Sequence, residues 1–330
     1  MGLERVFGPV SSRRLGRSLG VNNLPGKICT YSCVYCQAGR TARLTVERAA
    51  FCDWREVVEE VDRALRAVGA GGVDYVTFVP SGEPLLDANL GRAVRAVRDL
   101  GVRVAVLTNA SLLWREDCRA DAAEADLVSV KVDAASVGVW RALNRPHPQL
   151  RLSQVLEGLL EFSRGFGGTL ITETMLVDGV NTGGLEAVAE LVARLRPSKA
   201  YISVPTRPPA EPHVRPPGAA KLVEAFRAFA DRLGEGRVEL LNLPEPPPPP
   251  PRWDPVAWLT STASVHPLRL EHALAALEGV VDDPWEVISR LESEGAVEVV
   301  EYSGARYIVR RVGSAASDGA GPRDPAVSTV

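Results

Sequence analysis

The residues most able to do chemistry in this chain are three cysteines within eight positions. Cys29, Cys33 and Cys36 follow the spacing C-x3-C-x2-C, and the next cysteine, Cys52, lies sixteen positions further along. Thiolates are soft ligands that suit iron–sulfur clusters. A [4Fe–4S] cluster held by three cysteines keeps one iron with an open position, where another ligand can bind. The spacing therefore predicts a cluster that takes part in a reaction.

Two other interpretations of the cysteine motif remain open. A disulfide would leave one of the three thiols over, and residues 1–21 contain no apolar run of the kind that a secretion signal needs. A zinc ion would need a fourth ligand, and none of the four histidines lies within a hundred residues of the motif. A zinc site completed by a partner chain is the second alternative.

The composition is that of a soluble globular protein with no membrane span. The length of 330 residues is enough for one large domain and a small one. Of these residues, 45% are hydrophobic and 24% are charged. The net charge of −3 provides no electrostatic basis for nucleic-acid binding by the whole chain. Together with the reduced thiols that a cluster needs, these features predict a cytoplasmic protein.

The cysteine spacing, with Tyr35 directly before the third cysteine, resembles the signature of the radical SAM superfamily. Residues 7–21 resemble the leader of a subgroup related to the tRNA wyosine-forming enzymes, and the resemblance extends over roughly residues 8–210. It implies that the three cysteines hold a [4Fe–4S] cluster whose open iron binds S-adenosylmethionine. One electron from the cluster would then release a 5′-deoxyadenosyl radical.

A second motif, PSGEP at residues 80–84, follows a predicted strand and resembles the GGEP motif of the same superfamily. Ser81 replaces the first glycine, and a serine keeps the turn compact. The resemblance implies that Tyr35 and Gly82 line the S-adenosylmethionine pocket and that Glu83 lies at its amino end. The alternative is a plain turn between a strand and a helix.

Six predicted strands alternate with predicted helices along the first two thirds of the chain. They cover residues 19–23, 73–79, 102–108, 127–133, 169–177 and 200–204. This alternation predicts an α/β fold with a partial (β/α)6 TIM-like barrel of parallel strands. The cysteine loop, Glu83, Asn109, Lys131, Asp133 and the region of Thr206 all fall at the carboxyl ends of predicted strands, where the loops of such barrels build the active site. A last helix and a strand at 238–241 complete a core domain of residues 1–243.

Polar residues on one face of the strand at 127–133 suggest a ligand in the barrel lumen. Ser129, Lys131 and Asp133 alternate with valines, so they share a face. The resemblance implies that Lys131 and Asp133 face the ribose or carboxylate of S-adenosylmethionine, with Asn109 in the same pocket and Glu173 in the lumen beyond. An ion pair of Lys131 with Asp133 or Glu173 and no ligand is the alternative.

The arginines before the cysteine loop suggest an anionic substrate group. Arg13 and Arg14 are adjacent, and guanidinium groups bind carboxylate and phosphate in a forked geometry. The alternative is a basic surface segment that precedes the first strand.

The C-terminal quarter of the chain predicts a separate small domain. Residues 244–251 include six consecutive prolines and predict a stiff polyproline linker, so few contacts are expected to cross it. Three helices and a hairpin then predict a winged-helix-like domain at 252–312, followed by a disordered tail at 313–330. Between residues 252 and 311 there are six Arg, no Lys and ten Asp or Glu, a net charge of −4. This charge argues against duplex DNA and favours docking of a protein.

The chain is therefore predicted to be a radical SAM enzyme that abstracts hydrogen from a peptide, a protein or an RNA. A low-potential electron donor such as ferredoxin or flavodoxin is the expected partner. The alternatives are a tRNA base-modifying enzyme and a cluster-containing scaffold protein. Cys52 and Cys118 lack ligand spacing and supply no second cysteine triad, which argues against synthesis of a tetracyclic base.

Overall fold

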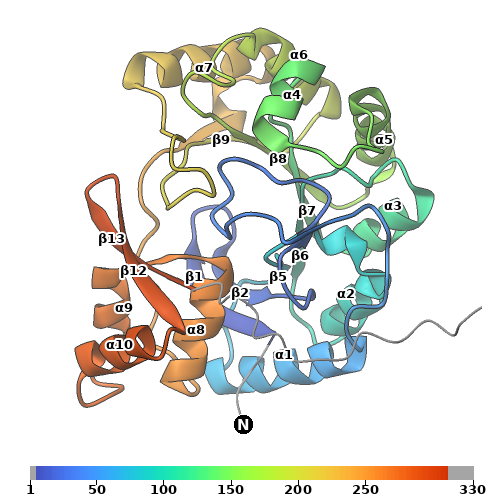
Figure 1. The fold of residues 1–330 in the computed structure, drawn as a ribbon. Helices are drawn as coiled ribbons and strands as arrows, with labels where there is room; N and C mark the ends of the chain where they lie inside the picture. Colours follow the sequence, from blue (N-terminus) through green and yellow to red (C-terminus); the bar gives the residue numbers. More distant parts are fainter. Residues whose placement is uncertain (1–4, 311–330) are drawn as a thin grey trace, which may run out of the picture.

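A curled sheet of eight strands forms the centre of the protein in the computed structural model, which describes residues 5–310 (Figure 1). The strand order is β1-β2-β5-β6-β7-β8-β9-β10, and all pairs are parallel except β1 with β2. The strands are β1 (Val6–Ser12), β2 (Gly16–Val21), β5 (Tyr75–Phe78), β6 (Val104–Thr108), β7 (Leu127–Lys131), β8 (Thr169–Met175), β9 (Lys199–Ser203) and β10 (Val238–Leu241). This open half-barrel confirms the predicted α/β class and partial TIM-like barrel.

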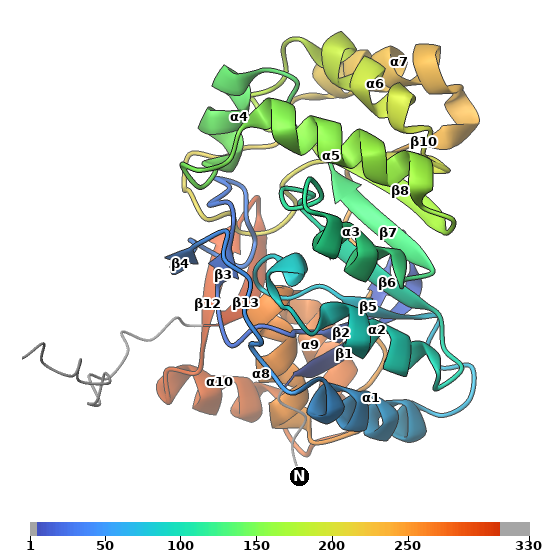
Figure 2. The same ribbon diagram turned by 90° about the vertical axis from the view of Figure 1, so that its right-hand side faces the viewer.

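Helices cover the outer side of the curled sheet (Figure 2). They are α1 (Trp54–Val68), α2 (Leu90–Arg98), α3 (Glu116–Ala123), α4 (Val137–Asn144), α5 (Leu152–Gly165), α6 (Leu185–Leu195) and α7 (Ala219–Leu233). Their apolar faces bury the outward valines of the strands, such as Val128 and Val130 of β7, which are both fully buried. None of the helices between residues 5 and 310 has both the length and the apolar character that a bilayer crossing requires.

The N-terminal hairpin differs from the prediction, which placed no strand before residue 19. Residues Val6–Ser12 form β1, which pairs antiparallel with β2. The ring of Phe7 packs over Gly20, where an added Cβ would lie 2.1 Å from a ring carbon. The sequence of β1 shows no clear strand alternation. The strand forms because pairing with β2 and this close approach stabilise it. The helix α4 was not predicted either.

A second unit, the C-terminal module (residues 254–310), contains the predicted three helices and hairpin. Its elements are α8 (Pro255–Val265), β11 (Leu268–Arg269), α9 (Leu270–Leu277), α10 (Pro284–Ser293), β12 (Val297–Tyr302) and β13 (Ala305–Arg310). The three strands form an antiparallel sheet in the order β11-β13-β12, over a separate core that includes Trp258, Ile288 and Ile308. The winged-helix assignment stays a prediction, and the tail predicted at 313–330 lies outside the described residues.

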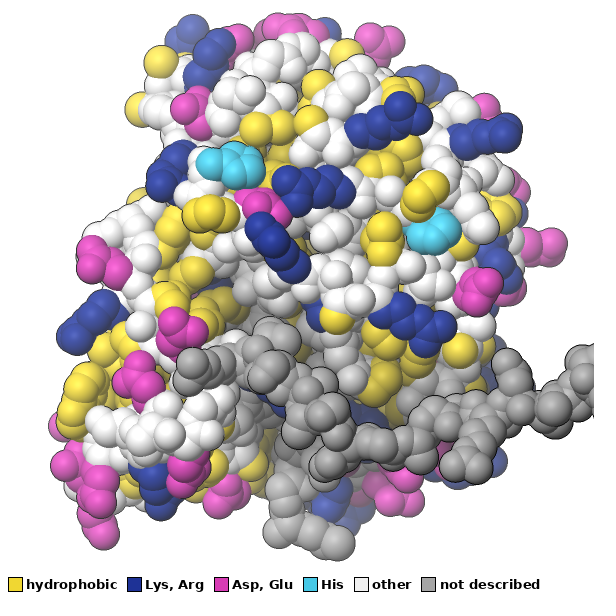
Figure 3. Space-filling view, in the orientation of Figure 1, with side chains coloured by type: hydrophobic (Ala, Val, Ile, Leu, Met, Phe, Trp, Pro, Cys, Tyr) yellow, Lys and Arg dark blue, Asp and Glu magenta, His cyan; other side chains and the backbone are white. Residues whose placement is uncertain are grey.

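The C-terminal module packs directly on the barrel. The hydroxyl of Tyr307 donates to the carbonyl of Thr206 at 2.7 Å, and that of Tyr302 donates to the carbonyl of Pro205 at 3.2 Å. Trp253 at the end of the linker packs against the cores of both units. The expectation that few contacts cross the proline linker is therefore wrong. Asp and Glu side chains lie on the surface of the module at the lower left of Figure 3.

We expect a chain that ends at Leu243 to unfold at a lower temperature than the full chain. Truncation removes the helix α8 that packs on β1 and uncovers apolar surface of the barrel. A chain that ends at Arg310 keeps all the described contacts and is the control. Thermal unfolding of the three proteins, followed by circular dichroism, checks this expectation. An unchanged midpoint for the chain ending at Leu243 would show that the two units are independent.

Candidate functional site

The cysteine loop lies across the carboxyl ends of the barrel strands (Figure 1). It begins at β3 (Ile28–Cys29), which pairs with the short strand β4 (Arg43–Leu44). The end of α4 holds its middle, because Ser32 N donates to Asn144 O at 3.0 Å and Val34 N donates to Leu143 O at 2.9 Å. The loop is thus anchored by a helix more than a hundred residues away in sequence.

Each cysteine sulfur of the loop accepts a hydrogen bond from a side-chain nitrogen. The pairs are Asn109 Nδ2 with Cys29 (3.5 Å), Asn144 Nδ2 with Cys33 (3.4 Å) and Lys27 Nζ with Cys36 (2.7 Å). Donors of this kind stabilise thiolates, and hydrogen bonds to the sulfurs are among the features that set the reduction potential of an iron–sulfur cluster. The loop is therefore surrounded by groups that suit negatively charged sulfur.

The three thiols differ in acidity. Burial raises the pKa of Cys29 to about 11 and that of Cys33 to about 12. Burial acts in the same direction on Cys36, but the charge of Lys27 and its hydrogen bond outweigh it, so the pKa of Cys36 is lowered. Cys36 is thus the thiol most readily ionised, and the other two would release protons when a metal binds.

The donor set fits an iron–sulfur cluster. All five cysteines of the chain are free thiols, so the disulfide alternative is wrong for this structure. Among residues 5–310, no three His, Cys, Asp or Glu side chains converge as the ligands of a single metal ion would. Cysteines that each bind a different iron of a cube do not have to meet at one point.

The Gly82–Glu83 turn packs directly against β3. A Cβ added at Gly82 would lie 1.7 Å from the carbonyl oxygen of Ile28, and the amide of Glu83 donates to that oxygen at 3.1 Å. The buried carboxylate of Glu83 accepts hydrogen bonds from Thr108 Oγ1 at 2.5 Å and from the amide of Asn109 at 2.8 Å. Burial raises the pKa of Glu83 to about 7. Glu83 thus connects the turn to the end of β6, where Asn109 contacts Cys29.

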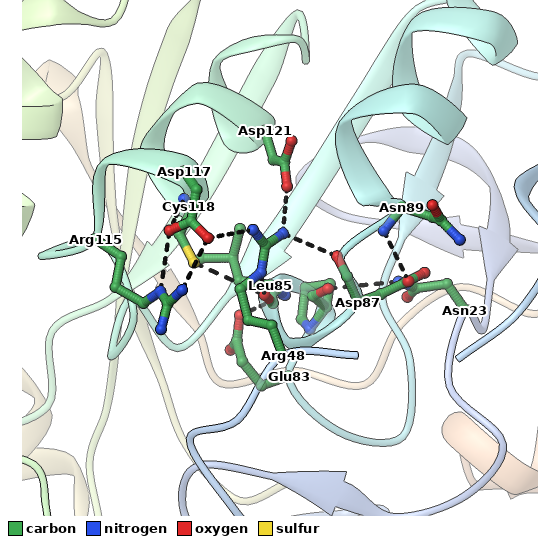
Figure 4. Close-up of polar contacts among 11 residues, drawn as sticks. Asn23, Arg48, Glu83, Leu85, Asp87, Asn89, Arg115, Asp117, Cys118 and Asp121 are labelled. Carbon is green, nitrogen blue, oxygen red and sulfur yellow. Dashed lines mark hydrogen bonds and ion pairs between the residues drawn. The ribbon is translucent and has the colours of Figure 1, made fainter. Parts of the chain in front are cut away.

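Arg48 holds the segment that follows this turn, the 3-10 helix Pro84–Leu86, in place (Figure 4). Its guanidinium donates to the carbonyls of Leu85 at 2.8 Å and Asp87 at 3.0 Å. The same group pairs with Asp117 at 2.8 Å and also contacts Asp121, both from α3. Because Arg48 satisfies acceptors from two segments at once, the turn that carries Glu83 has a rigid support.

Asp133 differs from the prediction that it faces the lumen. Its carboxylate accepts hydrogen bonds from the hydroxyl of Tyr35, from Asn144 Nδ2 at 3.0 Å and from the amide of Met175 at 2.8 Å. It is not among the residues that line the cavity described below. The reason is that β7 ends at Lys131, so the alternation of faces does not extend to residue 133. Asp133 instead supports the cysteine loop from behind.

A cavity of 280 Å³ runs from the cysteine loop into the barrel lumen. It brings together the predicted site residues other than Asp133, since its lining includes Cys29, Cys33, Tyr35, Cys36, Gly82, Glu83, Asn109, Lys131 and Glu173. Lys131 Nζ lies 2.7 Å from Glu173 Oε1, which also accepts from Ser203 Oγ at 2.9 Å. The ion pair between Lys131 and Glu173 that the alternative named is therefore present in the structure. Burial lowers the pKa of Lys131.

Several residues of the site were not predicted. Lys27 is one of only four lysines and stands just before the motif, which is a signal that could have identified it. Asn144 lies at the end of the unpredicted helix α4 and has no such signal. Val265 and His266 of the C-terminal module also line the cavity, and Val265 O accepts from Gln37 Nε2 at 3.2 Å. Only the packing of the module on the barrel places them there.

Comparisons with known proteins show which family the chain resembles. Residues 23–192 match the Radical SAM superfamily. A UPF0026 protein of Methanocaldococcus jannaschii is 37% identical over 311 residues, 94% of this chain and 97% of that protein. A UPF0026 protein of Synechocystis is 34% identical over 205 residues, 62% of this chain and 76% of that protein. A solved structure of TYW1 with a lysine-pyruvate adduct bound has a TM-score of 0.45 and 13% identity, covering 89% of this chain and 80% of that one.

Proposed function

Because the chain belongs to the radical SAM superfamily, enzymes that bind a [4Fe–4S] cluster and S-adenosylmethionine, we propose that it abstracts hydrogen from a substrate held in its lumen. The observation that carries the proposal is that the three cysteines and the Gly82–Glu83 turn line one cavity. When bound, the cluster supplies one electron that cleaves S-adenosylmethionine into methionine and a 5′-deoxyadenosyl radical. The cavity is the space in which the cofactor and the substrate meet.

The roles of the chain's residues follow from their positions. Cys29, Cys33 and Cys36 would hold the irons. The nitrogen donor beside each sulfur forms a hydrogen bond that orients the sulfur. Tyr35 and Gly82 line the S-adenosylmethionine pocket. The absence of a side chain at Gly82 lets the turn approach β3 closely, so the cofactor has room against the backbone.

Other residues of the pocket hold the cofactor or the cysteine loop in place and do not react themselves. Glu83 orients the amide of Asn109, so the amino end of the cofactor meets a fixed backbone. Lys131 offers a cation to the cofactor's carboxylate or ribose, with Glu173 as its counter-ion. Asp133 acts as a positioning residue, because it holds Tyr35 and Asn144 against the loop.

The C-terminal module helps to exclude water from the reaction. Val265 and His266 close one side of the cavity, and an enclosed site protects a radical from side reactions. The substrate is a peptide, a protein or an RNA that inserts one group into this space. The electron comes from a donor such as flavodoxin or ferredoxin, which superfamily enzymes typically need, and the reducing cytoplasm is the compartment that suits the cluster.

We expect the anaerobically reconstituted and reduced protein to convert S-adenosylmethionine into 5′-deoxyadenosine and methionine, even without its substrate. Glu83→Gln keeps the shape of the side chain but removes its charge, so cleavage should slow while the iron content stays that of the wild type. Liquid chromatography with mass spectrometry measures both products. S-adenosylhomocysteine as the only product would indicate an ordinary methyl transfer and contradict the proposal.

A further inference from the structure

Four cations from distant segments line the cavity. We call this set the basic end and define it by Arg13, Arg14, Lys131 and Arg207. The first two lie in the turn between β1 and β2, Lys131 ends β7, and Arg207 follows β9. These positions are far apart in sequence, so the fold itself gathers the charges.

Two carboxylates face these four cations. Glu173 is shared by Lys131 and Arg14, and the linker residue Glu245 pairs with Arg207. The cavity's other charged groups are Lys27, which contacts Cys36, and Glu83, which is bound by Thr108. The imidazole of His266, 3.0 Å from Glu245, adds no negative charge. The basic end therefore carries an excess of two positive charges.

Among residues 5–310, Arg13 is the one of these four cations with no carboxylate within ion-pair distance, although the charges of Glu245 and Glu239 act on it from further away. Its Nη2 donates to the carbonyl of Leu241 at 3.4 Å, and its buried Nε has no hydrogen-bond partner within residues 5–310. Burial also lowers the pKa of Arg13 and of Arg14. Arg13 is half-buried, but an unsatisfied donor such as its buried Nε costs folding free energy, and a bound anion would compensate for it.

We propose that the basic end binds an oxyanion of the substrate, either a phosphate monoester or a dicarboxylate. This inference rests on the proposed function and specifies the charged group that its peptide, protein or RNA substrate carries into the cavity. Arginine forks match the two oxygens of such groups, and the doubly charged forms balance the excess of two charges. If Lys131 turns to the carboxylate of the cofactor, the other three cations still exceed the two carboxylates by one charge.

The location of the basic end determines how such a substrate lies. Because the basic end and the three cysteines line the same cavity, an anion held by the arginines keeps the rest of the substrate within the space that the proposed function assigns to the radical. The C-terminal module takes part, because His266 Nε2 lies 3.0 Å from Arg207 Nη2 and Glu245 holds the same guanidinium. The module thus positions one of the anion-binding residues.

The test measures binding of inorganic phosphate and of malonate to the full-length reconstituted protein by isothermal titration calorimetry at constant ionic strength. We expect at least one probe to bind and to raise the unfolding temperature. Arg13→Gln should weaken that binding about tenfold or more, because a charge-assisted hydrogen bond is lost. Arg17→Gln is the matched control, since Arg17 lies on the same hairpin but pairs with Asp74 at the surface. It should bind like the wild type.

Arg13→Lys covers the case in which the glutamine variant does not fold. It keeps the charge and loses the fork, so its affinity should fall between those of the wild type and Arg13→Gln. Stronger binding of phosphate identifies a phosphate monoester, and stronger binding of malonate identifies a dicarboxylate. Absence of binding by the wild type, or equal weakening in the Arg13 and Arg17 variants, overturns the inference. Cleavage of S-adenosylmethionine is measured separately, so failure of the proposed function is distinguishable.

Discussion

Replacement of Cys29, Cys33 or Cys36 with Ala is expected to abolish cluster binding. In the proposed function each thiolate would hold a different iron, so the loss of one would leave two irons without a protein ligand. The wild type reconstituted without oxygen should contain about four iron and four sulfide per chain, and each variant should contain close to none. Iron and sulfide assays, with the visible absorption of the cluster, measure the difference.

The two remaining cysteines provide matched controls for this experiment. Cys118 is buried in α3 beside the carbonyl of Leu85, and Cys52 lies beside Asp87. Neither lines the cavity, so Cys52→Ala and Cys118→Ala should keep the full iron content. Stoichiometric zinc in protein purified without oxygen would favour the zinc alternative and contradict the cluster.

Gly82→Ala is expected to be the most damaging single change outside the cysteines. The new Cβ would lie 1.7 Å from the carbonyl oxygen of Ile28 and 2.6 Å from its carbonyl carbon. Both are backbone atoms, so no side-chain rotation relieves the clash. Because Ile28 directly precedes Cys29, any shift that makes room displaces the first of the three proposed cluster ligands. We expect the free energy of unfolding to fall by roughly 1–3 kcal/mol or more, together with a loss of iron.

Gly165→Ala is the control for this substitution. Gly165 ends the helix α5, and a Cβ added there meets no atom within 4 Å. Alanine is favoured over glycine in helices by about 1 kcal/mol, so this variant should be as stable as the wild type or more stable. Urea unfolding and iron content of both variants check the comparison. Equal stability of the two variants would mean that the backbone at Gly82 can shift to accommodate a Cβ at little cost in folding free energy.

Local patterns in the sequence were sufficient to predict the cluster motif and most of the barrel. The cysteine ligands lie within eight residues, so their spacing alone indicates a shared site. The helices α1 and α2 repeat apolar residues at helical spacing, as in α1 with Val57 and Val61 buried on one face. Strand ends followed by polar residues predicted which edge of the sheet carries the site. These features depend on residues that are close in the sequence, so they can be predicted from the sequence alone.

The tertiary structure alone decided which groups surround the cluster ligands and what closes the cavity. Asn144 contacts Cys33 across 111 positions, and His266 meets Arg207 across 59. Asp133 turned away from the lumen because β7 ended two residues earlier than its pattern suggested. Contacts of this kind join segments that are remote in the chain. They leave no periodic signal, because the free energy that selects them comes from burial and hydrogen bonding in the folded core.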